Sequence, residues 1–98
     1  MRFEIEITDE ALEDLRQFKK HERNRIGDAF ESQLTHQPGH ETRNRKVLRP
    51  NQLVEWELRI GVFRVFYDID FVTSRVKIVA VGRKVGSCLF IHGEEFDL

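Results

Sequence analysis

Hydrophobic and charged residues alternate along positions 54–69, in two runs that meet at Gly61. Because successive side chains of a strand point to opposite faces, this pattern predicts two strands joined in a hairpin. The apolar row, which should face the core, comprises Val54, Trp56, Leu58, Ile60, Phe63, Val65, Tyr67 and Ile69. The opposite row, which should face solvent or a ligand, comprises Glu55, Glu57, Arg59, Val62, Arg64, Phe66 and Asp68.

The two rows limit the register of this hairpin. Setting Leu58 against Phe63 brings the apolar rows together and places Glu57 opposite Arg64. A loop of two or four residues around Ile60 and Gly61 is compatible with this pairing, whereas a three-residue loop would mix the two faces. Isoleucine is poorly suited to the first central position of a two-residue turn, where φ is positive, so we expect the four-residue loop.

The first third of the chain predicts a strand followed by two helices. Charged and apolar residues alternate over residues 2–7, as in a half-buried strand. Thr8 can cap a helix whose first turn carries Asp9 and Glu10, where the helix dipole favours negative charge. An apolar stripe runs through Ala11, Leu12, Leu15 and Phe18 and resumes after a polar run at Ile26, Ala29, Phe30 and Leu34. We therefore expect an antiparallel helical hairpin that ends at the Gln37-Pro38-Gly39 sequence.

The rest of the chain predicts further strands. The basic run 40–50 reads as an exposed loop leading into a short strand at about residues 45–49. Residues 75–81 are β-branched and apolar on both faces over their second half, which indicates an interior strand. Residues 82–86 interrupt the pattern, and residues 88–92 predict a short last strand. The order βααββββ is that of an α+β fold, with the helical hairpin packed on one face of a mainly antiparallel sheet.

Length and composition fit one domain spanning residues 1–98, with 40% hydrophobic residues. The sequence contains no apolar run of about 18 residues and no signal-peptide pattern. Its single cysteine, Cys88, excludes an internal disulfide, and we interpret this side chain as a small buried hydrophobe. These features lead us to expect a cytoplasmic protein.

The net charge of −1 conceals a segregation of charge along the chain. Residues 1–41 carry six Lys or Arg against ten Asp or Glu, residues 42–93 carry ten against four, and residues 94–98 carry three acidic residues. The basic second half either faces a polyanion or an acidic protein, or is an ordinary solvated surface.

The charged face of the hairpin is the main candidate for chemistry, because no metal-ligand spacing, P-loop, dinucleotide-binding or nucleophile-elbow motif is present. One interpretation is a solvated sheet face with a Glu57–Arg64 ion pair worth ~0.2–1 kcal/mol. The other is a phosphodiester site. The guanidinium groups of Arg59 and Arg64, with Lys84 nearby, suit phosphate oxygens and stabilise charge that develops on them.

The chain resembles the RelE/ParE superfamily of bacterial type II toxins in its order of elements and in two sequences, W-E-L-R-I-G-V-F-R-V-F-Y-D-I and V-K-I-V-A-V-G-R-K. The resemblance implies a RelE-like toxin that causes growth arrest, needs no cofactor or membrane, and is neutralised by a small cognate antitoxin of Phd/YefM or RelB type. It also allows a homo-oligomer. In the RelE branch it implies an mRNA interferase, a metal-independent, ribosome-dependent endoribonuclease that binds the ribosome and mRNA and inhibits translation. In the ParE branch it implies a non-catalytic inhibitor of DNA gyrase, and a degenerate binding module of the same fold is a third alternative.

The RelE branch also implies a catalytic set. The 2′-OH of the RNA attacks the adjacent phosphate, so the protein supplies cations and acid–base groups, which here are Arg64, Arg59, Glu57, Lys84 and His92. The sequence departs from that branch at three positions: Glu55 and Glu57 stand in place of lysines, and Phe90 in place of a catalytic tyrosine. His92, two residues further on, is the candidate to replace this tyrosine as the proton donor.

A second set of basic residues is expected to bind ribosomal RNA through charge alone, without taking part in chemistry. This set comprises Arg43, Arg45, Lys46, Arg49 and Arg83.

Overall fold

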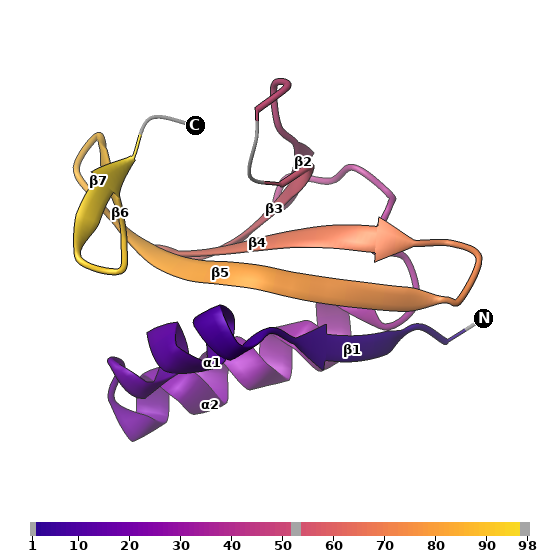
Figure 1. Ribbon diagram of the computed structural model, residues 1–98, viewed down its shortest axis with the longest axis horizontal. Helices are drawn as coiled ribbons and strands as arrows, with labels where there is room; N and C mark the ends of the chain where they lie inside the picture. Colours follow the sequence, from indigo (N-terminus) through magenta and orange to yellow (C-terminus); the bar gives the residue numbers. More distant parts are fainter. Residues whose placement is uncertain (1, 52–53, 97–98) are drawn as a thin grey trace.

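A computed structural model of the chain describes residues 2–51 and 54–96 (Figure 1). Over these residues one sheet of seven strands has the order β2-β3-β4-β5-β6-β7, and β1 pairs with β5 beside this path. The strands are β1 (Glu4–Ile7), β2 (Arg45–Val47), β3 (Trp56–Ile60), β4 (Phe63–Asp70), β5 (Arg75–Val85), β6 (Cys88–Ile91) and β7 (Glu94–Phe96).

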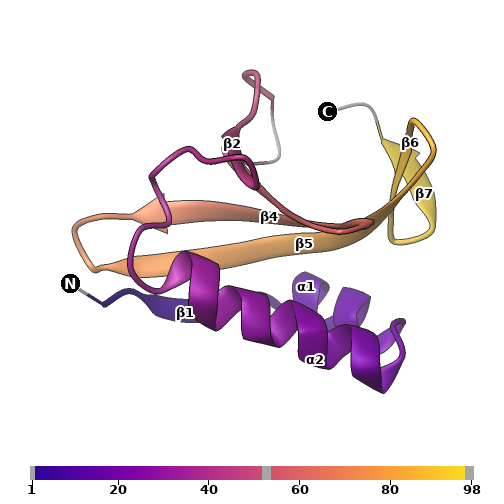
Figure 2. The ribbon, with the colours of Figure 1, turned by 180° about the vertical axis from the view of Figure 1, so that it is seen from behind.

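Helices cover one face of this sheet, and they are α1 (Asp9–Arg16), α2 (Lys20–Ala29) and a π-helical turn η1 (Phe30–Leu34) that continues α2. On the side away from the helices, β2 and the β6–β7 hairpin rise at the two ends of the sheet, as the opposite views in Figures 1 and 2 both show. We call this uncovered, concave side the open face. The α+β fold with helices on one face of a mainly antiparallel sheet is thus confirmed.

One pair of strands is parallel: β1 lies along β5, with Glu4 opposite Arg75 and Ile7 opposite Ile78. The other strand pairs are antiparallel. Strand β7 was not predicted from the sequence, because Glu94 and Glu95 dominate its composition. It forms because it pairs with β6, which brings Phe96 opposite Leu89.

The predicted faces of the β3–β4 hairpin are confirmed, but its predicted register is wrong by two residues. Ile60 pairs with Phe63, and Glu57 lies opposite Phe66 instead of Arg64. The loop contains only Gly61 and Val62, with Gly61 at the first central position and φ +59°. A positive φ suits glycine there, so the glycine fixes the turn. A shift of two residues leaves every side chain on its expected face, which is why the alternation alone could not detect it.

The first helix begins as predicted, since the Thr8 hydroxyl accepts a hydrogen bond from the backbone N–H of Ala11 at 3.1 Å. Its buried face was partly wrong, because Leu12 is exposed and Asp14 is buried. The second helix starts earlier than predicted. The side chain of Glu22 accepts a hydrogen bond from the backbone N–H of Lys19 at 2.8 Å, and the polar residues that follow form an exposed helical turn.

Two apolar clusters fill the two sides of the sheet. The larger lies between helices and sheet and includes Leu15, Ile26, Leu34, Leu58, Val65, Tyr67 and Ile78. The smaller lies on the open face and consists of Val54, Phe66, Ala80, Leu89 and Ile91. Val54 therefore belongs to the open face, contrary to the row predicted for it. The β6–β7 hairpin is held to the open face through this second cluster, because Phe96 packs against it.

Strand β5 runs past the predicted break at Gly82 to Val85. A side chain at Gly82 would place its Cβ 2.5 Å from the carbonyl oxygen of Phe90, so only glycine lets β6 approach this closely. The glycine that suggested an interruption is instead the residue that allows β5 to continue between β4 and β6.

Candidate functional site

Four charged side chains converge on the open face: Glu57, Arg59, Arg64 and Lys84. They line a groove whose remaining wall is formed by Leu48, Ser87, Leu89 and Phe96. We call this feature the cationic groove. Among the described residues that line the groove, three charges are positive and one is negative, so these side chains carry an excess of two positive charges beside a largely apolar wall.

Three adjacent strands supply these side chains. Glu57 and Arg59 are two residues apart on β3 and therefore share a face. Arg64 on β4 lies directly opposite Arg59 and also pairs with Gly82 of β5. Lys84 is two residues beyond Gly82, so it projects from the same face one position diagonally from Arg64. The groove is thus a product of strand register.

Hydrogen bonds fix the two arginines in different ways. The Nε of Arg59 donates to Glu57 Oε1 at 2.8 Å, and Glu57 is only 8% exposed. Arg64 donates from one terminal nitrogen to the carbonyl oxygens of Gly61 at 2.6 Å and Phe63 at 2.9 Å. The guanidinium of Arg64 is therefore oriented before any ligand arrives.

The electrostatics of the groove favour an anionic ligand. Burial lowers the pKa of the Arg64 guanidinium below its ordinary value, Arg59 acts in the same direction, and Glu57 opposes both. The guanidinium remains protonated at neutral pH, because its ordinary pKa is far above 7. A phosphate bound between Arg59 and Arg64 would relieve the repulsion between these two opposed cations and would accept bidentate hydrogen bonds.

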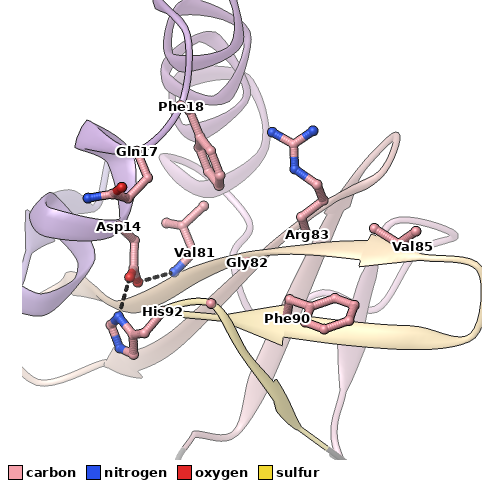
Figure 3. Close-up of a pocket in the computed structure, with 10 residues that line it drawn as sticks. Asp14, Gln17, Phe18, Val81, Gly82, Arg83, Val85, Phe90 and His92 are labelled. Atoms are coloured by element: carbon pink, nitrogen blue, oxygen red, sulfur yellow. Dashed lines mark hydrogen bonds and ion pairs between the residues drawn. The ribbon is translucent and has the colours of Figure 1, made fainter.

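His92, the predicted proton donor, lies outside the cationic groove. Strand β6 ends at Ile91, and His92 has a left-handed φ of +57° in the turn that follows. Its Nδ1 forms an ion pair with the buried Asp14 of α1 on the helix side of the sheet (Figure 3). Phe90 also faces that side. His92 is therefore not among the described residues that line the groove with Arg64, and this arrangement gives no support to the prediction that both act on one phosphate.

Two of the predicted RNA-binding residues have structural roles. Arg45 is 7% exposed and donates hydrogen bonds to the backbone and side-chain oxygens of Gln33 and to the carbonyl of His40, each at 2.9 Å. Arg83 lies over the rings of Phe18 and Phe63 on the helix side and pairs with Glu22 at 3.1 Å. Neither guanidinium is presented on the open face.

Alternation along β2 explains the difference between Arg45 and its neighbour. Arg45 pairs with Leu58 and shares its core face, whereas Lys46 pairs with Glu57 and shares the face of the cationic groove. Lys46, Arg43 and Arg49 are exposed, as predicted. Lys46 thus extends the positive surface next to the groove.

Sequence reasoning missed Asp14, Ser87 and Phe96. Asp14 could have been found, because it lies three residues after Ala11 and four before Phe18, on the apolar face of α1. The place of Phe96 in the groove follows from the β6–β7 pairing and has no local signal. Within residues 2–51 and 54–96, no three His, Cys, Asp or Glu side chains converge so that they could hold a metal ion.

Comparison with known proteins places these features in context. A family model described as the ParE toxin of the type II toxin–antitoxin system parDE matches residues 5–85. The fold is similar to that of the toxin–antitoxin complex RelBE2 from Mycobacterium tuberculosis, with a TM-score of 0.75 and 23% identity over 86% of this chain and 100% of that chain. It is also similar to the archaeal RelE–RelB complex from Pyrococcus horikoshii OT3, with a TM-score of 0.68 and 17% identity over 88% of this chain and 98% of that chain.

No curated protein sequence matches the chain. Among the helices that the structure describes, none combines the length and the hydropathy needed to cross a membrane.

Proposed function

The chain belongs to the ParE toxin family of type II toxin–antitoxin systems, and from this premise we propose that its cationic groove cleaves ribosome-bound mRNA and so inhibits translation. The observation that carries the proposal is the convergence of Arg59, Arg64 and Lys84 around Glu57 on the open face. Three cations beside one buried carboxylate suit a phosphodiester, whose negative charge increases in the transition state of 2′-OH attack.

The residues of the groove have complementary roles in such a reaction. The ionised carboxylate of Glu57 accepts the proton of the 2′-OH while the 2′ oxygen attacks the adjacent phosphorus atom. Arg64 and Arg59 bind the non-bridging oxygens, where charge accumulates. The bond to the 5′ oxygen breaks, and the Lys84 ammonium gives this oxygen its proton, because Lys84 lines the groove and His92 does not. The products are a 2′,3′-cyclic phosphate and a 5′-hydroxyl.

The basic surface beside the groove contributes affinity rather than chemistry. Lys46 adjoins Glu57 across the β2–β3 ladder, and Arg43 and Arg49 are exposed near the same edge. Charges of this kind bind the RNA backbone without regard to sequence and make association depend on salt.

A small cognate antitoxin is the expected partner in the cell. The two solved structures named above are toxin–antitoxin complexes. An antitoxin segment with acidic side chains would neutralise the positive charge of the cationic groove, and it would cover the open face, which the helices leave bare. Co-purification from the native host of a small protein encoded beside this chain tests this part of the proposal.

Inhibition of DNA gyrase without cleavage is a second candidate function, and one observation favours it. None of the described residues that line the cationic groove is a histidine or a tyrosine, and Glu57, the one carboxylate among them, already pairs with Arg59. A groove with few proton-transfer groups suits binding better than catalysis. In this case the same cations would contact an acidic surface of the gyrase.

One pair of assays separates the two functions. Purified protein is added to programmed ribosomes, where cleavage of the mRNA is followed, and to DNA gyrase, where supercoiling is followed. Arg64→Ala should reduce cleavage on the order of a hundredfold or more, because it removes a charge opposite the developing phosphorane. Arg75→Ala, an equal change of charge at an exposed position of β5, is the matched control and should cleave like the wild type.

Lys84→Ala, compared with Lys77→Ala on the same strand, tests the proton donor in the same way and should cost roughly 10²–10⁴-fold in cleavage. Intact mRNA together with inhibited supercoiling would overturn the ribonuclease proposal in favour of gyrase. Thermal unfolding of each variant shows that it is folded before activity is compared.

A further inference from the structure

Asp14 is a buried carboxylate that the proposed chemistry does not use. It is 3% exposed, accepts a hydrogen bond from the backbone N–H of Val81 at 2.9 Å, and forms an ion pair with His92 (Figure 3). These contacts join three elements that are distant in sequence: helix α1, the central strand β5 and the turn between β6 and β7.

The contact with Val81 fills a gap along one edge of β5. Strand β1 pairs with this edge up to Ile78, and β6 pairs with it from Arg83 onward. Between them α1 and its N-cap residue supply the partners: the Thr8 N–H donates to the Ile78 carbonyl at 3.1 Å, and Asp14 accepts from Val81. An unpaired N–H in this buried strand would be costly, so Asp14 anchors α1 to the sheet.

The contact with His92 fixes a turn that the sequence alone would not favour. His92 and Gly93 form the loop between the paired residues Ile91 and Glu94, with φ values of +57° and +76°. Glycine adopts such values freely, but for histidine they are uncommon and cost energy. The ion pair with Asp14 offsets this cost and holds the turn against α1.

The other end of the same hairpin lies on the far side of the sheet, in the cationic groove. Leu89 and Phe96 are opposed across β6 and β7, and both line the groove next to Arg64 and Lys84. Both also belong to or pack against the second apolar cluster. A displacement of the turn at His92 would therefore displace this apolar wall.

We propose that Asp14 and His92 are positioning residues that hold the β6–β7 hairpin against α1 and thereby keep the Leu89–Phe96 wall of the cationic groove in place. The pair acts through the hairpin, since neither residue is among those that line the cationic groove. That the ligand beside this wall is RNA rests on the proposed function. The mechanical link between the turn at His92 and the wall is independent of that function.

The surroundings of the pair make its state measurable. Burial raises the pKa of the Asp14 carboxyl, while the Val81 N–H and His92 lower it and the nearby Glu10 raises it. Glu13 and Gln17 of α1 and Arg83 of β5 line the adjacent cavities. Removal of His92 takes away a stabilising contact of the carboxylate, so the pKa of Asp14 should rise further.

Two substitutions break the link from opposite sides. His92→Gln removes the imidazole, and Asp14→Asn removes the charge but keeps an oxygen that can accept from Val81, so the sheet edge stays paired. The double variant completes the cycle. His21→Gln, at an exposed position of α2, is the matched control.

Amide hydrogen exchange of the whole chain measures how often the β6–β7 hairpin opens. Each single substitution should speed exchange at residues 88–96 by about tenfold or more relative to β4, because the hairpin opens more often, and the double variant should be no faster than the singles. In ¹³C NMR, the carboxyl of Asp14 should titrate at higher pH in the His92→Gln variant. Unchanged exchange at residues 88–96, or equal acceleration across the whole sheet, would overturn the proposal.

The consequence for the groove is measured with an uncleavable 2′-O-methyl RNA oligonucleotide as the probe. Both variants should bind it about three- to tenfold more weakly, an effect near 1 kcal/mol, while the His21→Gln variant binds like the wild type. Unaltered affinity in variants whose hairpin exchanges faster would overturn the link from turn to wall. Failure of the wild type to bind the probe would count against the RNA function, and exchange would still decide whether Asp14 and His92 hold the hairpin.

Discussion

Replacing Arg45 with alanine should unfold the protein more readily rather than weaken its contact with RNA. The side chain is 7% exposed, and its guanidinium makes three hydrogen bonds of 2.9 Å, two to Gln33 at the end of the π-helical turn and one to the carbonyl of His40. It thus ties the loop after the helices to the sheet. A cation at this end of a helix also complements the helix dipole.

The size of the effect follows from these contacts. A hydrogen bond that involves a charged group contributes about 1.5–3 kcal/mol, and breaking a buried charged network commonly costs about 3–5 kcal/mol. Here one partner is removed, and the acceptors that it leaves are neutral carbonyl or amide oxygens, so the cost should lie below that of leaving a buried charge unpaired. We therefore expect the free energy of unfolding to fall by about 2–4 kcal/mol, which lowers the Tm of a domain of this length by roughly 8–20 °C.

Urea and thermal unfolding, followed by circular dichroism, measure this change. Lys46→Ala is the control, because it removes the same charge from the neighbouring residue, which faces solvent beside the groove. The control should change the free energy of unfolding by less than about 0.5 kcal/mol. If the Arg45→Ala variant has the same free energy of unfolding as the Lys46→Ala variant and loses ribosome affinity to the same degree, the structural role assigned to Arg45 is incorrect.

Three further predictions follow from other contacts. Substituting Arg43 and Lys46 with alanine should weaken ribosome association and reduce the slope of log affinity against log salt concentration by roughly one unit per charge, measured by co-sedimentation at a series of salt concentrations. An unchanged slope would exclude the two residues from the interface. Tyr67→Phe should lower the free energy of unfolding by about 1–2 kcal/mol in urea titrations, because the buried hydroxyl donates to the carbonyl of Pro38 at 2.7 Å; wild-type stability would show that this hydrogen bond contributes nothing net. Burial raises the pKa of the Asp14 carboxyl above its ordinary 3.8, so the folded chain binds the carboxyl proton more tightly than the unfolded chain does. Protonation of Asp14 therefore stabilises the fold; this contribution is complete below pH 3.8 and is lost as the pH rises through the raised pKa. The free energy of unfolding of the wild type minus that of Asp14→Asn should accordingly fall across this window, and a rising difference would refute the sign.

The faces of the sheet were predictable from the sequence because alternation reports them directly. Leu58 and Arg64 lie on the faces that their positions predicted, and the groove exists because those faces are correct. The pairing partner of Glu57 was not predictable in this way, because registers that differ by two residues give the same faces. Gly61 held the missing information, since its positive φ belongs at the first position of the two-residue turn.

Other errors arose where a residue was assigned from its charge or spacing alone. Arg45 was grouped with its basic neighbours, although alternation along β2 directs it to the core side. His92 was placed on the strand face of Phe90 by counting two residues, and both side chains do line one cavity on the helix side of the sheet. The error lay in assigning that face to the groove. Phe90 pairs with Arg83, whose guanidinium lies over Phe18 and Phe63 on the helix side.

The parallel pairing of β1 with β5 also determines how early the chain can fold during synthesis. Residues 4–7 must wait for residues 75–78 before they gain their strand partner, and the apolar side of α1 must wait with them. Contacts of such long sequence separation delay folding, since the entropy of closing the chain is lost before the contacts form. Lys84 lies a few residues further along the same strand, so it emerges from the ribosome shortly after residues 75–78, which complete the core. A nascent chain interrupted after β4 therefore has neither a closed core nor a complete cationic groove.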